Sequence, residues 1–297
     1  MLLSKRKFFD KLSQQLFFCS SFISVLIVIG IFVFLLKESF PVYQEVSIFD
    51  FLFSAKWNPD GWDGEYYGVL ALVWGTIYVT LITLLISIPI GVLSAIFLAE
   101  IAPPKLQMFF KTAVEILAGV PSVVIGFFGI VFLGPFLAKI FGLNNGLNVL
   151  NGGILLSIMV LPTIISLSED AITAVPNSYR DASLAMGATK LETIIKVILP
   201  AASSGIVASI MLGMGRAIGE TMAVLMACGN APAIAASIFD SVRTLTATIA
   251  IEMGEVAYDT THYYALFQLG LFLFVISFFI NNIAEYFISK GIKHERI

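Results

Sequence analysis

Charge is scarce in this sequence. Only 12% of its 297 residues are charged and 58% are hydrophobic, whereas ordinary soluble domains carry about 25% charged residues. The mean hydropathy is +0.95. This composition argues against a soluble globular enzyme. The formal net charge is −3, so the chain lacks the basic surface that nucleic-acid binding requires.

Residues typical of catalytic and metal sites are also few. The two histidines, His262 and His294, stand far apart, which argues against a histidine-based metal site. No glycine is followed by lysine and no Gly-x-Ser-x-Gly segment occurs, so a phosphate-binding loop and a nucleophile elbow are both missing. Cys19 and Cys228 lie in apolar stretches and are expected to be packing residues. We therefore predict no catalytic residue, no metal and no cofactor on this chain.

Long apolar runs dominate what is present. A hydrocarbon core about 30 Å thick needs about 20 apolar helical residues to cross it. The candidate spans are residues 16–36, 69–99, 116–138, 152–168, 203–226 and 264–284. The alternating ten-residue segments of a transmembrane β-barrel are absent. The predicted fold class is therefore all-α, a polytopic membrane protein with six transmembrane helices embedded in lipid.

Basic residues predict the orientation of these spans. When the N-terminus is placed inside, most lysines and arginines fall in inside segments, so both termini are predicted to be cytoplasmic. The first apolar run follows a basic segment, as in a signal peptide, but it is too long and lacks a cleavage site. It is interpreted as a retained first helix.

The chain divides into three predicted parts. Residues 1–68 hold the N-terminal tail, the first span and an acidic, aromatic external loop. Residues 69–290 form a core of five spans, with a cytoplasmic elbow at about 169–204. Residues 291–297 are a short cytoplasmic tail.

The elbow contains two helix-start patterns. They are Ser178-x-x-Asp181 and Thr189-x-x-Glu192. The first helix is expected to end near Gly187, because glycine suits the left-handed position after a helix, and the second meets Pro200. The prediction is two short helices between the fourth and fifth spans. Such a pair can dock another protein or can be a plain connecting loop, and the local pattern leaves both open.

Within the predicted spans, charges occur only in the fifth, at Arg216 and Glu220. Their spacing of four places them on one face of a helix. An arginine at the centre of a span costs about 3 kcal/mol on insertion scales, so it normally marks a partner or a path. Its planar fork of donors matches oxyanions, including phosphate. The carboxylate can steady the arginine or accept a proton. The alternative is an intrahelical ion pair that only sets helix packing.

The third span carries Pro121 and Ser122 near its inner end. Proline inside a helix removes a backbone hydrogen bond and kinks the helix, which membranes tolerate where neighbouring groups satisfy the freed carbonyls. We predict a structural kink here, with a gating hinge as the alternative.

The elbow also has the spacing of a known motif, Glu-Ala-Ala-x3-Gly-x9-Ile-x-Leu-Pro. The matching residues are Asp181, Ala182, Ser183, Gly187, Val197, Leu199 and Pro200. Asp, Ser and Val replace the motif's Glu, second Ala and Ile. On this motif the chain resembles the importer-type ABC permeases.

Other segments are similar to phosphate permeases of the PstC type within that family. They are residues 57–59, 120–124 with Gly126, 216–224 and 229–232. The resemblance runs from about residue 15 to 290, and the long acidic external loop favours the PstC type over its PstA-type sister.

This resemblance implies a type I ABC importer fold and ATP-driven import of inorganic phosphate across the bacterial inner membrane. It implies a PstA-like sister permease, a PstB-like ATPase dimer that uses ATP and Mg, and a PstS-like extracytoplasmic phosphate-binding protein. The family's ATPase-coupling role falls on Arg180, Asp181, Ala182, Ser183, Gly187 and Pro200, and its intramembrane pair on Arg216 and Glu220. A permease for sulfate or molybdate, and an ion-driven secondary transporter, remain alternatives.

Overall fold

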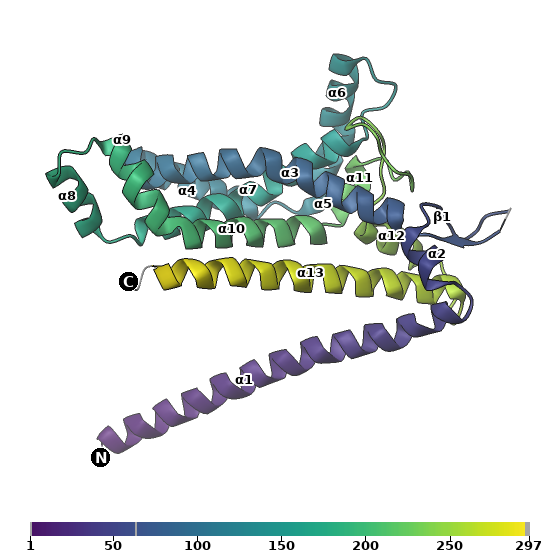
Figure 1. Ribbon diagram of the computed structural model, residues 1–297, viewed down its shortest axis with the longest axis horizontal. Coiled ribbons are helices and arrows are strands. Elements are labelled where there is room, and N and C mark those ends of the chain that lie inside the picture. The colour runs from purple at the N-terminus through teal and green to yellow at the C-terminus, as the bar shows by residue number, and fades with distance from the viewer. Residues whose placement is uncertain (1, 63, 295–297) are drawn as a thin grey trace.

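Long helices running side by side make up most of the chain (Figure 1). The computed structural model describes residues 2–62 and 64–294, with side chains described for 13–62, 64–283, 285 and 286. The helices are α1 (Leu2–Ser39), α2 (Ile48–Phe53), α3 (Leu70–Ile96), α4 (Pro104–Ala118), α5 (Ser122–Phe128), α6 (Gly134–Phe141), α7 (Val149–Thr173), α8 (Asn177–Ala185), α9 (Lys190–Thr193), α10 (Leu199–Gly219), α11 (Met222–Ala227), α12 (Leu245–Glu252) and α13 (Thr261–His294).

Short elements connect or continue these helices. They are the 3-10 turn η1 (Phe40–Gln44), the π-helical segments η2 (Phe97–Ile101), η3 (Gly129–Leu133) and η4 (Ile194–Ile198), and an antiparallel hairpin of β1 (Trp57–Asn58) and β2 (Tyr66–Tyr67). Helices α8 and α9 lie at one end of the bundle, which we call the elbow end. The hairpin and α12 lie at the other end, the hairpin end (Figure 1).

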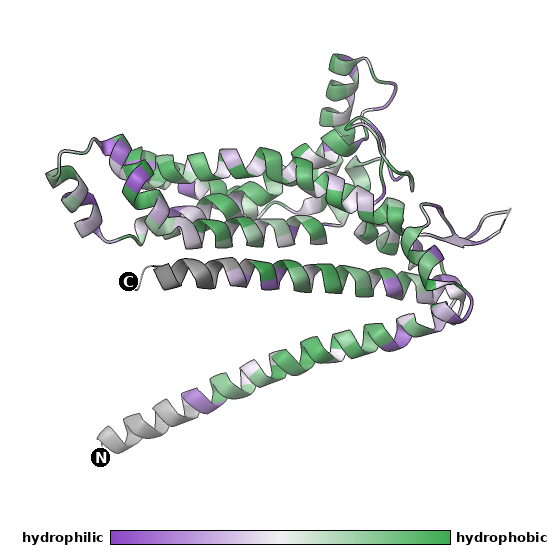
Figure 2. Cartoon of the chain, viewed as in Figure 1, coloured by the Kyte–Doolittle hydropathy of each residue, from purple (hydrophilic) through white to green (hydrophobic). Residues whose placement is uncertain are grey.

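Six stretches are long and apolar enough to cross a membrane, as predicted. In the described part of the chain they are Ser13–Gln44, Leu70–Ile101, Ser122–Phe141, Val149–Thr173, Lys190–Gly219 and Thr261–Ile283. Figure 2 shows hydrophobic residues along these helices, whereas hydrophilic residues gather toward the elbow and in the connections at the hairpin end. The fourth span is longer than predicted and includes Glu169 and Asp170 in its last turns.

The centre of the bundle is the pair α3 and α7. Small and hydroxylated residues of α3 are buried, among them Thr80, Thr83, Ser87 and Gly91. Thr83 Oγ1 lies 3.3 Å from the carbonyl oxygen of Gly153 on α7. On α7, a Cβ atom built at Gly153 would lie 2.5 Å from Cγ2 of Ile82. Small residues allow two membrane helices to approach closely, since van der Waals packing holds helices together in lipid. This close pair forms the centre of the bundle; α10 packs on α7, and α13 packs in turn on α10.

Helix α1 stands apart from that centre. It packs mainly on α13, through ring contacts of Phe32 with Phe274 and of Phe34 with Phe267, and its beginning points away from the bundle (Figure 1). None of its most apolar window is buried within the chain. The first span is therefore covered by lipid or by another chain.

The third span differs from the prediction. Pro121 does not kink a helix: α4 ends at Ala118, and Pro121 caps the start of α5 in an extended conformation, with φ −60° and ψ 137°. The fixed φ of proline suits the position just outside a helix, and a proline inside α4 would have cost a hydrogen bond. The spanning segment therefore begins at Ser122, later than residue 116, and α4 is a separate helix with no buried residue.

We predict that Gly153→Ala weakens the α3–α7 contact. Alanine favours a helix over glycine by about 1 kcal/mol, but the added methyl group would overlap Ile82, and overpacking costs about 1–3 kcal/mol. The matched control is Gly30→Ala in α1, where nothing lies within 4 Å of the added Cβ. Thermal unfolding in detergent should occur at lower temperature for Gly153→Ala only. An equal response of the two variants contradicts the packing assignment.

Candidate coupling and translocation sites

The elbow is a pair of helices whose starts differ from each other. Helix α8 begins at Asn177 after Pro176, and neither Ser178 nor Asp181 caps it, so the first predicted capping pattern is wrong. Proline supplies the fixed extended entry to the helix instead. Gly187 follows α8 with φ +86°, the left-handed conformation predicted there.

The second predicted cap is confirmed. The side chain of Thr189 accepts a hydrogen bond from the backbone N–H of Glu192, and Glu192 Oε2 accepts from the backbone N–H of Thr189 at 2.9 Å. Helix α9 does not end at Pro200, however. It continues through η4 into α10, and Pro200, which has no N–H to donate, lies two residues after the π-helical segment η4, where the regular hydrogen-bond pattern of the helix is already interrupted. The second elbow helix is thus the start of the fifth span rather than a separate helix.

The predicted coupling residues divide into an outer and an inner set. Asp181, Ala182, Gly187 and Pro200 are exposed. Ser183 is buried, and its hydroxyl lies 2.9 Å from that of Thr193 on α9. The tip also exposes apolar side chains, namely Tyr179, Leu184, Met186 and Leu191, with Met186 85% exposed. An exposed apolar cluster at a polar end of the bundle is typical of a protein contact surface.

Arg180, the remaining coupling residue, points into its own chain. Its Nη2 donates to Glu100 Oε1 at 2.6 Å, and its Nη1 donates to the carbonyl of Val175 at 2.6 Å. Glu100 lies in η2, at the end of the second span. The elbow helix α8 is therefore connected directly to the ends of the second and fourth spans.

A second ion pair fastens α4 to the same region. Lys111 Nζ lies 2.7 Å from Glu169 Oε2, and Gln107 Nε2 donates to Glu169 Oε1 at 3.1 Å. The Glu169 side chain is only 5% exposed, whereas that of Asp170, 3.4 Å from Lys111, is 64% exposed. The hydrogen bond to Glu169 raises the pKa of Lys111 above its usual value, so the lysine stays charged at neutral pH.

The charged pair of the fifth span lies at a break in that span. Helix α10 ends at Gly219, Glu220 is extended with ψ 131°, and α11 begins at Met222. The prediction that Arg216 and Glu220 share one helical face is therefore wrong. The described chain shows no ion pair between them. Instead Glu220 Oε1 accepts the backbone N–H of Ala223 at 3.3 Å, and so caps α11.

This break suits the two charges electrostatically. Arg216 lies in the last turn of α10, where the helix dipole favours a cation, and Glu220 lies at the start of α11, where the dipole favours an anion. Membrane transport proteins use such interrupted helices where backbone lines a cavity or a site. The glycines of the surrounding segment alone did not predict the interruption.

Arg216 belongs to an open face of α10. Leu212, Gly215, Arg216 and Gly219 recur at helical spacing, and a Cβ atom built at either of these glycines meets nothing within 4 Å. Gly213, on the opposite side, packs against Val160 of α7. The fifth span thus packs on α7 and on α13, and it has an open region at Gly215 and Gly219 beside Arg216.

The guanidinium of Arg216 reaches the middle of the fourth span. Its Nη1 donates to Thr163 Oγ1 at 3.3 Å, and Thr163 lies near the midpoint of α7 (Val149–Thr173). Among the residues the structure describes, no carboxylate forms an ion pair with Arg216. A cation in this position needs water, an anion or a second chain.

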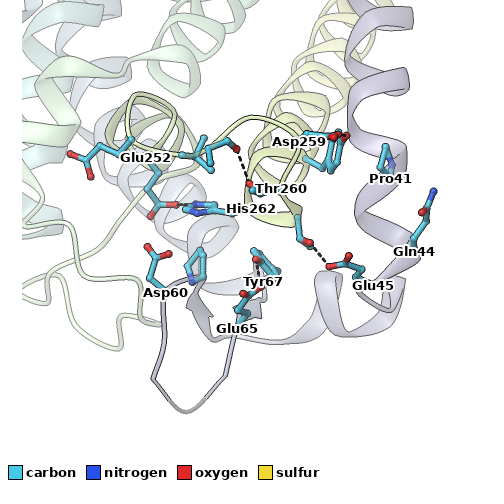
Figure 3. Close-up of a pocket in the computed structure, with 16 residues that line it drawn as sticks. Pro41, Gln44, Glu45, Asp60, Glu65, Tyr67, Glu252, Asp259, Thr260 and His262 are labelled. Carbon is cyan, nitrogen blue, oxygen red and sulfur yellow. Dashed lines mark hydrogen bonds and ion pairs between the residues drawn. The ribbon is translucent and has the colours of Figure 1, made fainter.

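A cavity lined by many polar residues lies at the hairpin end (Figure 3). It has a volume of about 790 Å³. Its lining includes the carboxylates of Glu45, Asp60, Glu65, Glu252, Glu255 and Asp259. Burial, together with a hydrogen bond from its own hydroxyl to Glu65, raises the pKa of Tyr67 above its usual value. Such a cavity repels anions, and no cluster of metal-binding side chains occurs in the described residues.

One carboxylate of that cavity connects several elements. Glu252 accepts hydrogen bonds from Trp57 Nε1 at 3.0 Å and from Arg243 Nη1 at 2.8 Å, and lies 2.9 Å from His262 Nε2. The hairpin, the segment before α12 and the start of α13 therefore meet at Glu252. These contacts give Glu252 a structural role, because it holds the three elements together.

A bundle of six spans, with an interrupted charged span and a protruding elbow but no nucleotide-binding loop, defines a multi-pass membrane transport component. The chain belongs to the family of binding-protein-dependent transport system inner membrane components, whose model matches residues 87–292. Members of this family are transport subunits rather than enzymes.

Its relatives are named as ABC transporter permeases. The protein named Probable ABC transporter permease protein YqgH, from Bacillus subtilis (strain 168), is 42% identical over 82% of this chain and 79% of its own length. The phosphate transport system permease protein PstC of Mesorhizobium japonicum is 38% identical over 84% and 81%. The chain is similar to both over most of its length.

Solved structures share the fold at lower identity. The inward-facing MetNI methionine ABC transporter matches with a TM-score of 0.60 at 20% identity, over 75% of this chain and 95% of that one. A bacterial alginate ABC transporter, in complex with an alginate pentasaccharide-bound periplasmic protein, matches with a TM-score of 0.62 at 13% identity, over 93% and 95%. The type I ABC importer permease fold predicted from the elbow motif is confirmed.

Sequence reasoning did not single out Glu100, Glu169 or Thr163. Each of the two glutamates ends an apolar run, where a carboxylate is usually solvated, and Thr163 is one of many polar residues within the spans. The available signal was the position of Glu169 directly after the apolar run of the fourth span. A carboxylate that is buried there needs a cationic partner such as Lys111.

We predict that Lys111→Met destabilises the elbow end. It leaves the buried Glu169 carboxylate with Gln107 as its remaining side-chain partner, and because the Lys111 side chain is 41% exposed we expect a cost of about 1–3 kcal/mol, that of leaving a buried polar group unsatisfied, rather than the larger cost of breaking a fully buried ion pair. Asp170→Asn is the matched control, because its exposed contact with Lys111 contributes at most about 1 kcal/mol. Unfolding in detergent monitored by tryptophan fluorescence measures both. Equal stability of the two variants contradicts a structural role for Glu169.

Proposed function

We propose that this chain is a permease subunit of an ATP-driven importer of inorganic phosphate. Relatives named phosphate transport system permease protein PstC, 30–38% identical over most of the chain, support phosphate as the cargo. The observation that carries the proposal is Arg216, which stands at a break in the fifth span on a face open to a second chain or to water.

The cargo is proposed to pass Arg216. The guanidinium donors match the oxygens of phosphate, and the low dielectric of a membrane path strengthens that attraction. Binding has to stay weak, because a pathway must also release its ion. Thr163, a neutral neighbour, leaves the charge of Arg216 available to the anion, whereas Glu220, four residues further along the chain, offers a negative charge that is proposed to weaken the binding. Glu220 is proposed to accept a proton from, or to repel, a passing oxyanion.

The partners complete the path and supply the energy. A sister permease of the PstA type is proposed to cover the open face of α10. A dimer of a PstB-type ATPase is proposed to bind ATP and Mg and to dock on the exposed tip formed by Asp181, Ala182 and their apolar neighbours. A PstS-type binding protein is proposed to deliver phosphate at the hairpin end. This chain is proposed to bind no nucleotide or cofactor itself.

The proposed location is the inner membrane of a bacterium, with both termini in the cytoplasm. The beginning of α1 and the end of α13 lie at the same end of the bundle as α8 and α9, which supports this orientation (Figure 1). ATP binding is proposed to close the ATPase dimer and to carry the elbow with it, turning the path from inward-facing to outward-facing. Pro121 and Ser122, between α4 and α5, are a proposed hinge for that change.

We predict that Arg216→Gln abolishes import while leaving the complex assembled. The measurement is ATP-dependent uptake of radiolabelled phosphate into proteoliposomes that contain the four proposed components. Losing one charge-assisted contact to the anion should lower uptake at least about tenfold, with Arg216→Lys intermediate because it keeps charge but loses the fork. The matched control is Lys139→Gln in α6, an exposed cation without an assigned role, which should transport normally.

Competition identifies the cargo. Excess unlabelled phosphate should block uptake, whereas excess sulfate or molybdate should not. Transport of sulfate or molybdate instead of phosphate would contradict the proposed cargo but would leave the proposed class of transporter unchanged. Uptake by this chain and its sister permease in the absence of an ATPase would contradict the proposal that ATP hydrolysis drives import. Unchanged uptake by Arg216→Gln would remove Arg216 from the path.

A further inference from the structure

We infer that Arg180 is a positioning residue, which passes the movement of α8 to the second and fourth spans. This inference rests on the proposed function, in which an ATPase moves the elbow. Arg180 lies beside the exposed tip of α8, yet its charged group is directed away from any docking partner and into the chain.

The contacts of Arg180 reach two spans at once. Its Nε and Nη2 both donate to Glu100 Oε1, at 3.1 and 2.6 Å, so the second span is held through its last π-helical turn. Its Nη2 and Nη1 donate to the carbonyls of Ile172 and Val175, at 3.1 and 2.6 Å. These carbonyls lie in the last turn of α7 and just beyond it, and the carbonyl of Ile172 also accepts the backbone N–H of Val175 at 3.3 Å.

The arrangement is buried and nearly saturated. The side chains of Arg180 and Glu100 are 19% and 9% exposed. All three guanidinium nitrogens already donate, and Nη1 has a further weak contact at 3.4 Å with Asn177 Oδ1. An arginine in this state has few donors left for an ATPase. Its planar fork, held by a carboxylate and two carbonyls, instead resists rotation of α8 about the short connection to α7.

Other contacts make α8 part of one rigid unit. Only Ala174, Val175 and Pro176 connect α7 to α8, and this connection alone would permit a swivel. The Ser183–Thr193 contact, about one turn further along α8, fixes this helix to the start of the fifth span. Arg180 connects α8 to the second and fourth spans. A movement of α8 is therefore passed to the second, fourth and fifth spans together.

The first test compares transport with ATP hydrolysis in the reconstituted four-component complex. We expect Arg180→Gln to keep the ATPase bound during purification and to hydrolyse ATP at a rate within about twofold of wild type. Phosphate imported per ATP should fall about tenfold, as the loss of charge-assisted hydrogen bonds predicts. Arg180→Lys should be intermediate, and Glu100→Gln should resemble Arg180→Gln. The control Lys196→Gln removes an exposed cation of the same end and should leave the ratio unchanged.

Three outcomes would overturn the inference. Loss of the ATPase from a folded Arg180→Gln complex would make Arg180 a docking residue. An unchanged ratio of import to hydrolysis would leave it with no part in coupling. If Arg180→Gln lowers the phosphate imported per ATP and Glu100→Gln does not, the contact between Arg180 and the second span has no part in coupling.

A second test does not depend on the cargo. Spin labels at Ser178→Cys on α8 and Leu167→Cys on α7, in a Cys19→Ser and Cys228→Ser background, report the distance between the two helices. In wild type this distance should be the same without nucleotide and in the vanadate-trapped state, because the helices move together. In Arg180→Gln, or in Glu100→Gln if Arg180→Gln fails to fold, it should change between the states. A change already present in wild type would overturn the inference, whichever oxyanion the transporter carries.

Discussion

A charged side chain in hydrocarbon has to be paired, hydrated or shared with another chain, and Arg216 meets this constraint in the fifth span. Its one hydrogen bond in the described chain is to the neutral Thr163, at the middle of α7. The helix is interrupted one turn later, and open space lies beside Arg216 at Gly215 and Gly219. A burial cost of this kind is tolerated where a function depends on it. The open region beside Arg216 is where we propose that a second permease chain packs.

In contrast to the open region beside Arg216, the two ends of the bundle are held together by ion pairs and hydrogen bonds between different elements. At the elbow end, Arg180 and Glu169 connect α8, α4 and the ends of the second and fourth spans. At the hairpin end, Glu252 joins the hairpin, the segment before α12 and α13. Interruptions lie between these fixed ends, at Pro121 and at Glu220. Rigid bodies joined by a few non-helical residues are what a hinge motion requires.

Sequence reasoning recovered the spans because an uncharged run of about 20 apolar residues is long enough to cross a bilayer and is typical of a membrane helix. It recovered Gly187 and the Thr189–Glu192 cap because both depend on local backbone geometry. It failed where tertiary contacts decide. The i, i+4 rule assumed an unbroken helix at Arg216 and Glu220, and a helix break that is stabilised by capping and by neighbouring spans leaves no clear local signal. Arg180 and its partner Glu100 likewise lie 80 residues apart in sequence, beyond the reach of any spacing rule.

The most direct measurement of the central claim is chemical access to the face beside Arg216. Gly215→Cys fits without overlap, because nothing lies within 4 Å of its added Cβ. In a Cys19→Ser and Cys228→Ser background of the assembled transporter, a negatively charged, membrane-impermeant thiol reagent should modify this cysteine. Phosphate should slow the modification, sulfate should not, and trapping the ATPase with vanadate should change its rate. A cysteine that never reacts, or that reacts at a rate indifferent to phosphate and nucleotide, would contradict a phosphate path along Arg216.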